Sequence, residues 1–454
     1  MSNPGDADTT PILSTAQLAE YIEAGCKPPG AFRIGTEHEK FGFRWADFSP
    51  PPYEPGGIRA VLERLAAEAG AKPILDHGVP IGLKLAEGEI SLEPGGQFEL
   101  SGAPVETLHE TNTELTAHFA TLDKVAAPLG IGFAPLGFHP LATREAMPWM
   151  PKSRYAIMRA YMPKVGRRGL DMMLRTCTVQ ANLDYASEAD MVRKLRVCLC
   201  LQPLASALFA NSPFSEGRPN GFLSLRAEIW RDTDPDRTGI PAVFFESGFG
   251  FERYVEWLLD VPMYFIRRQG AYRDLAGRSF RDFMAGRLPE AKGERPTLGD
   301  FADHMTTVFT DVRLKRFLEM RGADASSPAL MLAQSALWVG LLYDPAALAA
   351  AAALIARHPW QEFAALRDQV PRLALAAPWQ GGTLRDLARE VVAIAADGLA
   401  ARARRNSAGE DERIYLVPLQ EIAAGAPTAA ERWLERFQGP WGGDVRPIFK
   451  EAKV

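Results

Sequence analysis

Residues 33–43, RIGTEHEKFGF, are the stretch that decides the predicted fold. Apolar and aromatic residues stand at both ends, and Pro and Gly residues bound the run, which is typical of a buried strand. Side chains alternate along a strand, so Glu37 and Glu39 should share one face while His38 points to the other.

Two carboxylates side by side on a buried face repel each other and lose hydration. A hard divalent cation between Glu37 and Glu39 is the simplest way to compensate both effects. The alternative is an edge strand whose charged face is solvated. The stretch therefore predicts a metal site or a polar edge.

The composition is that of an ordinary globular protein. The chain has 454 residues, of which 47% are hydrophobic and 24% charged, as in ordinary globular proteins, and its length alone would allow about three domains. A net charge of −5 gives no reason to expect a nucleic-acid partner. The most apolar run, 346–356, is too short to span a bilayer, so no membrane partner is expected.

The N-terminus and the cysteines predict the compartment. Residues 1–11 are polar and lack the basic start and apolar core of a secretory signal, and residues 1–13 are expected to be disordered. The four cysteines show no zinc-site spacing and are expected to be buried thiols in a reducing cytosol. The predicted location is therefore cytoplasmic.

A second acidic segment, residues 81–100, predicts a strand, a turn at Pro94-Gly95-Gly96 and another strand. The turn can re-aim side chains, so Glu93 and Glu99 need not follow simple alternation. Two carboxylates beside a glycine-rich kink suit a metal or phosphate site. A plain hairpin with a polar face fits equally well.

Polar and basic residues mark three further segments. Residues 153–161 predict a helix, and 163–169 a basic loop that could close over a triphosphate or simply be solvated. A long strand is expected over 170–185, with Thr176, Thr178, Gln180 and Asn182 on one face.

Arginines among carboxylates define the last two candidates. Arg226, Arg231 and Arg237 lie near four acidic residues, which indicates either recognition of a small carboxylate or a surface ion-pair network. In VRLKRFLEMRGAD, residues 312–324, a strand would place Glu319 and Arg321 on one face, where they could hold a metal and a phosphoryl group.

These strands are spread from residue 32 to residue 321, so one sheet should run through most of the chain. The prediction is a single catalytic domain over 14–454, with a sheet-bearing core at 14–326 and a mostly helical part at 327–454.

Several stretches together resemble the plant-type glutamate–cysteine ligases, a group that also occurs in proteobacteria. They follow in order from about residue 14 to about residue 450: RIGTEHEKFGF, ISLEPGGQFELSGAP, YMPKVG, GLDMMLRTCTVQANLD, LFANSPF, NGFLSLR, IWRDTD, DVPMYF and VRLKRFLEMRGAD.

The resemblance implies an α+β fold with a bowl-like antiparallel sheet flanked by helices, like glutamine synthetase and the guanidino kinases. It implies an enzyme that uses ATP and Mg²⁺ to join the γ-carboxylate of L-glutamate to the amine of L-cysteine through a γ-glutamyl phosphate, the first step of glutathione synthesis. Its partners would be these small substrates, and it would be a monomer or weak homodimer.

The resemblance also implies roles for single residues. Arg226 would grip a substrate carboxylate, and Arg321 would steady the transferring phosphoryl group. The magnesium ligands would be Glu37, Glu39, Glu93, Glu99, Glu319 and, less firmly, Gln180. The cysteine pocket would use Tyr155, Tyr264 and Trp230. Nucleotide or substrate would be contacted by Lys152, Arg154 and Lys164.

One departure from the plant enzymes concerns redox control. Where they are associated with two regulatory disulfides, this chain has Asn112 and Leu332 and lacks the partners after Tyr272. We therefore expect no thiol switch and no dimerisation tied to one.

Three other functions remain open from the sequence. The first is a glutamate ligase that uses another small amine. The second is a metal-binding sensor of glutamate or nucleotide that performs no turnover. The third is a metal-dependent hydrolase, although arginines beside Glu319 and around Arg226 favour two anionic substrates over attack by water.

Overall fold

The computed structural model describes residues 8–454, and its centre is a nine-stranded sheet in which every pairing is antiparallel. The strand order is β14-β15-β7-β1-β5-β4-β3-β2, and β6 pairs with the second half of β1. Its strands are β1 (Ile34–Arg44), β2 (Lys72–Asp76), β3 (Val79–Lys84), β4 (Glu89–Leu92), β5 (Phe98–Ser101), β6 (Ile131–Ala134), β7 (Thr178–Leu183), β14 (Val312–Leu314) and β15 (Leu318–Asp324).

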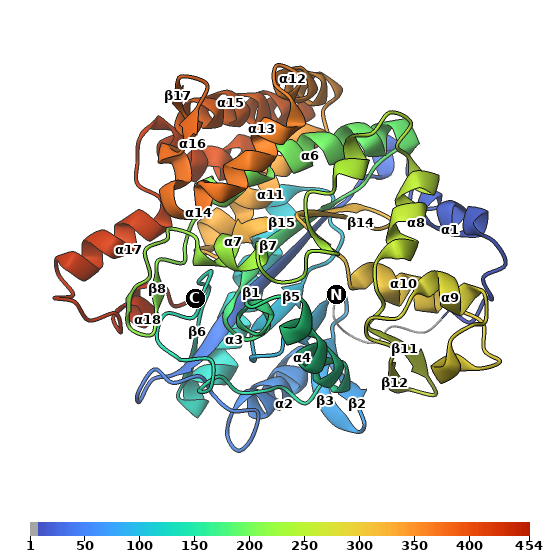
Figure 1. The fold of residues 1–454 in the computed structure, drawn as a ribbon. Coiled ribbons are helices and arrows are strands. Elements are labelled where there is room, and N and C mark those ends of the chain that lie inside the picture. Colours follow the sequence, from blue (N-terminus) through green and yellow to red (C-terminus); the bar gives the residue numbers. More distant parts are fainter. Residues whose placement is uncertain (1–7) are drawn as a thin grey trace.

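Helices cover the sheet and form most of the C-terminal part (Figure 1). Up to residue 306 they are α1 (Thr15–Glu23), α2 (Ile58–Ala69), α3 (Leu108–Ala126), α4 (Ser153–Val165), α5 (Gly169–Arg175), α6 (Glu188–Leu208), α7 (Leu225–Trp230), α8 (Phe251–Asp260), α9 (Phe280–Met284) and α10 (Leu298–Thr306). After the sheet they are α11 (Pro328–Leu342), α12 (Pro345–Ile355), α13 (Trp360–Ala365), α14 (Val370–Leu373), α15 (Leu384–Arg402), α16 (Val417–Ala424), α17 (Ala429–Gln438) and α18 (Ile448–Glu451).

Short two-stranded ribbons complete the fold outside the main sheet. They pair β8 (Phe214–Ser215) with β9 (Arg218–Pro219), β10 (Thr238–Gly239) with β13 (Phe309–Thr310), β11 (Phe265–Arg268) with β12 (Ala271–Asp274), and β16 (Pro378–Trp379) with β17 (Gly382–Thr383).

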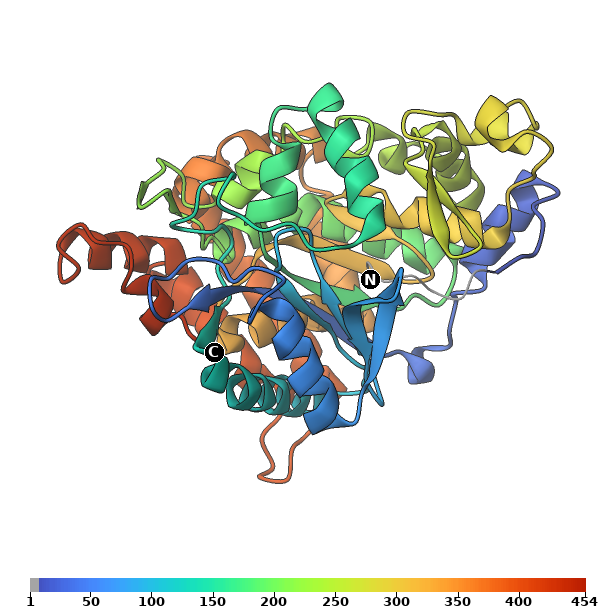
Figure 2. The same ribbon diagram turned by 90° about the horizontal axis from the view of Figure 1, so that it is seen from below.

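Strand β1 separates two faces, as its alternation predicts. On one face the ring of His38 lies 5.1 Å from the ring of Phe119 in α3, and the Thr36 hydroxyl lies 2.8 Å from that of Ser335 in α11. Glu37 and Glu39 point to the opposite face. Figure 2 shows the sheet between α3 on one side and α4 on the other. The predicted α+β architecture is confirmed.

Helix α11 explains why the helical part packs against the sheet. Its sequence, PALMLAQSALWVGLL, is apolar on all sides, and such a helix must be covered all round. Pro328 occupies the first turn, where a missing N–H costs nothing. Among residues 8–454 no single helix is long and apolar enough to cross a bilayer; α11 and α12 satisfy that test only as a pair bent by 91°.

The structure corrects three local predictions. Residues 170–175 are helical (α5) instead of the start of a long strand, because Asp171 and Arg175 form an i, i+4 ion pair of 2.6 Å. The expected loop at 163–169 is partly the last turn of α4. The segment before Pro94 is two strands, β3 and β4, joined by a turn at Gly88.

The N-terminal prediction is wrong for residues 8–13. Pro11 pairs with Thr297, and Ile12 is only 4% exposed, because its side chain joins the apolar core near α1. Residues 1–7 lie outside the described residues.

Candidate active site

A cavity lies over the face of the sheet that carries Glu37 and Glu39. Helices α4, α5 and α7 form its other walls, and converging polar groups in a cavity are typical of a site for small-molecule substrates. Its polar and charged lining residues are Glu37, Glu39, Glu93, Gln97, Glu99, Arg154, Tyr155, Thr176, Thr178, Gln180, Arg226, Trp230, Thr306, Arg313 and Arg321. The two acidic segments predicted separately therefore meet at one cavity.

Four carboxylates form the acidic side of this cavity: Glu37, Glu39, Glu93 and Glu99. The antiparallel register sets Glu39 directly opposite Glu99, and like charges in that position repel. Burial, and then the charges of Glu99 and Glu93, raise the pKa of Glu39 well above its usual range. Burial and the charge of Glu37 raise the pKa of Glu99 to about 7.

These four carboxylates suit Mg²⁺ that is also bound by substrate phosphates. In residues 8–454 no three acidic, histidine or cysteine side chains stand together as a preformed cage for one ion. However, Mg²⁺ commonly takes only one or two carboxylates and completes its shell with water and substrate phosphates. Closely spaced carboxylates whose charges oppose one another, facing a cavity, suit ions that arrive with a nucleotide.

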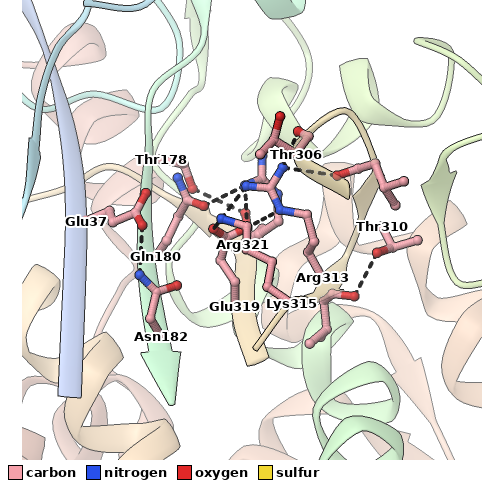
Figure 3. Close-up of polar contacts among 12 residues, drawn as sticks. Glu37, Thr178, Gln180, Asn182, Thr306, Thr310, Arg313, Lys315, Glu319 and Arg321 are labelled. Carbon is pink, nitrogen blue, oxygen red and sulfur yellow. Dashed lines mark hydrogen bonds and ion pairs between the residues drawn. The ribbon is translucent and has the colours of Figure 1, made fainter. Parts of the chain in front are cut away.

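A cluster of cations forms the facing side, shown in Figure 3. Glu319 is fully buried and accepts hydrogen bonds from Arg313 Nη2 (3.0 Å), Lys315 Nζ (2.9 Å) and Arg321 Nη1 (2.8 Å). Although burial disfavours its charge, these cations hold the pKa of Glu319 well below the ordinary value. One carboxylate thus holds three cations, which leaves a net positive charge beside the cavity.

Glu319 therefore stands apart from the other predicted magnesium ligands. It is not among the lining residues, and the three cations occupy both its oxygens. The sequence pattern correctly paired it with Arg321. It missed Arg313, which lies directly opposite Glu319 in the β14–β15 hairpin.

Gln180 lies between the acidic and basic sides. Its amide oxygen accepts a hydrogen bond of 2.6 Å from Arg321 Nη1, so in this structure it orients the guanidinium. Its neighbour Asn182 donates to Glu37 Oε1 over 2.7 Å, and the backbone N–H of Thr178 donates to Glu39 Oε2 over 2.9 Å. Strand β7 thus orients two carboxylates of the acidic side, Glu37 and Glu39, and one guanidinium of the basic side, Arg321.

Arg226 differs from the other arginines of its segment. Arg231 and Arg237 form ion pairs with Glu228 (2.7 Å) and Asp234 (2.6 Å). Arg226 is 3% exposed and lines the cavity, and no carboxylate lies within 4 Å of its guanidinium among the described residues. A buried guanidinium in a cavity wall is a ready partner for a substrate carboxylate.

The other predicted substrate residues divide into two groups. Tyr155, Trp230 and Arg154 line the cavity. Tyr264 does not: it is fully buried behind the wall, where its hydroxyl donates to Asp234 (3.2 Å) and its ring packs 3.9 Å from the Arg237 guanidinium.

The two lysines predicted to contact nucleotide are also outside the lining. Lys164 is exposed on the last turn of α4, because that helix continues where a mobile loop was expected. Lys152 is 3% exposed at the N-cap of α4; burial lowers the pKa of its amine to about 8, and the charge of Glu93 opposes that fall.

The sequence analysis did not identify two cations of the basic side, Arg313 and Lys315, which bind Glu319. Their signal was present: they alternate with Val312 and Leu314 just before the turn that leads to Glu319. Reading the segment as a hairpin instead of one strand would have found them.

Comparison with known proteins assigns the chain to a family. The family model for glutamate–cysteine ligase family 2 (GCS2) matches residues 33–451. The chain belongs to this family. The chloroplastic glutamate–cysteine ligase of Arabidopsis thaliana is 50% identical over 442 residues, which are 97% of this chain and 83% of that protein. Glutamate–cysteine ligase B of Oryza sativa subsp. japonica, also chloroplastic, is 49% identical over a match that covers 97% of this chain and 88% of that protein.

Solved structures of more distant proteins share the fold of this GCS2 family member. A glutamate–cysteine ligase from Francisella tularensis in complex with AMP superposes with a TM-score of 0.54 at 12% identity, over 92% of this chain and 88% of that chain. A bifunctional glutathione synthetase from Pasteurella multocida superposes with a TM-score of 0.50 at 14% identity, over 96% of this chain and 52% of that chain. At these identities the likeness concerns the fold alone.

The relatives contradict the predicted cytoplasmic location, since they are named chloroplastic. The prediction was wrong because its two arguments, the lack of an apolar secretory core and the presence of free thiols, do not separate one reducing compartment from another.

Proposed function

We propose that this protein is an ATP-dependent glutamate–cysteine ligase whose active site is the cavity over β1. The observation that carries the proposal is the division of one cavity into an acidic side and a basic side. Activating a carboxylate with ATP brings several anions together, so the site must supply cations and places to bind them.

Each side has its own task in this proposal. Glu37, Glu39, Glu93 and Glu99 would hold Mg²⁺, which when bound neutralises the polyphosphate and polarises the γ-phosphoryl group. Arg226 binds a glutamate carboxylate, and Arg321 and Arg313 stabilise the charge on the transferring phosphoryl group. Glu319 keeps these two arginines oriented.

The reaction proceeds in two balanced steps. An oxygen of the glutamate γ-carboxylate attacks the γ-phosphorus of ATP, and ADP leaves. The cysteine amine then attacks the γ-glutamyl carbon, phosphate leaves, and the amine loses a proton. Trp230 and Tyr155 line the cavity where the acceptor would bind. The molecule would act as a monomer or weak homodimer.

An ADP-release assay tests the proposal directly. Glutamate, cysteine, ATP and Mg²⁺ together should give ADP and γ-glutamylcysteine, and omission of Mg²⁺ should abolish both. Faster turnover with a different small amine would instead support a ligase with another acceptor. Tight glutamate binding without ADP release would indicate a sensor, and metal-dependent hydrolysis of γ-glutamylcysteine without ATP would indicate a hydrolase.

Arg226→Ala should raise the glutamate KM by about 10- to 100-fold, because one charge-assisted contact is lost. The KM for ATP should stay unchanged. Arg231, the C-cap of the same helix, is ion-paired at the surface, so Arg231→Ala is the matched control and should change neither constant. An unchanged glutamate KM in Arg226→Ala would remove Arg226 from the substrate site.

Activity should not depend on thiol redox state. All four cysteines are free; burial raises the pKa of the Cys177 thiol well above its usual range and that of Cys200 to about 12, which suppresses the reactive thiolate. We expect equal kcat after treatment with diamide or dithiothreitol. A sharp fall in kcat on adding reductant would contradict this prediction.

A further inference from the structure

A buried carboxylate outside the cavity lining, that of Asp324, has no assigned role in the proposed reaction. It ends β15, is fully buried, and among the described residues has no lysine or arginine within ion-pair distance. Its oxygens instead accept hydrogen bonds from the backbone N–H of Asn211 (2.9 Å) and the hydroxyls of Ser212 (2.6 Å) and Ser224 (2.9 Å).

Three of the sequence stretches that carry the family resemblance converge on this carboxylate. Asn211 and Ser212 come from LFANSPF, Ser224 from NGFLSLR, and Asp324 itself ends VRLKRFLEMRGAD. The proposed reaction uses arginines of NGFLSLR and VRLKRFLEMRGAD together with Glu319, but neither Asp324 nor any residue of LFANSPF. The backbone at Gly137 also closes on Asp324, since a Cβ built there would lie 2.4 Å from the carboxylate carbon.

The same hydrogen bonds fix the short helix that carries Arg226. Ser224 is the N-cap of α7 and accepts from the backbone N–H of Ala227 (3.1 Å). The Ser212 hydroxyl, while donating to Asp324, accepts from the backbone N–H of Arg226 (3.2 Å). A six-residue helix has little stability of its own, so such contacts must set its position.

The guanidinium of Arg226 is attached to the same strand. Its Nη2 donates to the backbone oxygen of Arg321 over 2.9 Å, three residues before Asp324 in β15. Arg226 is therefore tied to β15 at two points, through Ser212 at its backbone and through Arg321 at its side chain. A shift of Asp324 would move α7 relative to the strand that carries Arg321.

We propose that Asp324 is a positioning residue for substrate recognition: through Ser212 and Ser224 it holds Arg226 where it can bind the glutamate carboxylate. This inference rests on the proposed function, in which Arg226 binds glutamate. Asp324 touches neither substrate nor nucleotide and acts through Arg226.

A purely structural carboxylate would give different kinetics. Loss of stability lowers the amount of active enzyme and with it the apparent kcat, whereas misplacement of Arg226 raises the glutamate KM. If Asp324 acts only through Arg226, its replacement must also lose its effect once Arg226 is gone, because coupled residues are not additive.

The test uses Asp324→Asn and Ser212→Ala in the full chain, alone and combined with Arg226→Ala. Each alone should raise the glutamate KM by about tenfold, part of the loss expected for Arg226→Ala, with the ATP KM and kcat per folded molecule unchanged. In the Arg226→Ala background neither should raise it further. Calorimetry with glutamate should show the same ratios of Kd.

Glu412→Gln is the matched control. Glu412 is also fully buried, and it accepts hydrogen bonds from the backbone N–H of Leu108 (2.8 Å) and from Arg402 (3.0 Å), at residues that do not line the cavity. It should lower Tm without changing the glutamate KM.

Two results would overturn the inference: an unchanged glutamate KM in Ser212→Ala, or a full multiplicative effect of Asp324→Asn on top of Arg226→Ala. Ser212→Ala removes only a hydroxyl, so it decides the question if Asp324→Asn fails to fold. Absence of ADP release by the wild type would overturn the proposed function instead, and the calorimetric comparison would still test the link between Asp324 and Arg226.

Discussion

Arg321→Ala is expected to lower kcat by about 10³-fold with little change in the glutamate KM, because it removes a fixed positive charge from the place where the phosphoryl group transfers. Arg321 lines the cavity, and Glu319 and Gln180 hold its guanidinium at 2.8 and 2.6 Å. The fold should survive, since Arg313 and Lys315 still compensate Glu319.

Two further variants sharpen this prediction. Arg321→Lys keeps the charge but loses the planar pair of donors, so its kcat should lie between those of the wild type and Arg321→Ala. Arg316→Ala changes an arginine in the turn of the same hairpin, whose side chain contacts the Ala24 carbonyl and the Tyr21 ring away from the cavity, and it should leave kcat unaltered. Equal losses in Arg316→Ala and Arg321→Ala would show that damage to the hairpin, not the lost charge, slows the reaction.

Glu37→Gln is expected to lower kcat by about 10²- to 10³-fold at saturating substrates and to raise the Mg²⁺ concentration needed for half-maximal rate. The substitution is isosteric, and Gln can still accept the hydrogen bond from Asn182. Without metal, Tm should not fall, because removing one of four neighbouring charges relaxes their repulsion. The measurements are a Mg²⁺ titration of ADP release and thermal unfolding with and without Mg²⁺ and an ATP analogue.

Glu89→Gln is the control for that experiment. Glu89 lies on β4, which is separated from β1 by β5; it pairs with Lys84 and does not line the cavity. Its Mg²⁺ dependence should match that of the wild type. An unchanged Mg²⁺ requirement in Glu37→Gln would exclude Glu37 as a ligand.

Features set by local periodicity could be predicted from the sequence. Alternation along β1 placed Glu37 and Glu39 on one face, and the helix predicted over 153–161 is present as part of α4. These patterns depend on neighbours two to four residues away, so no knowledge of the tertiary structure is needed.

Features set by distant partners could not be predicted. Nothing local to Arg321 shows that Gln180, on another strand, orients its guanidinium. Likewise, the side chains that enclose Tyr264 come from Asp234 and Arg237, so burial behind the wall looks the same in sequence as a place in the substrate pocket. Cross-strand pairing and long-range ion pairs override local preference.

The two-faced character of β1 has a consequence for how this sequence can change. Its first half lies between β5 and β7 and its second half pairs with β6, so deleting Thr36 would shift the register, send the acids into the aromatic layer beneath α3 and bring His38 and Lys40 to the cavity. Such a shift of strand register should yield insoluble protein instead of a soluble enzyme with a low kcat. Evolution can therefore lengthen the surface loops of this molecule, but the spacing within this strand is fixed.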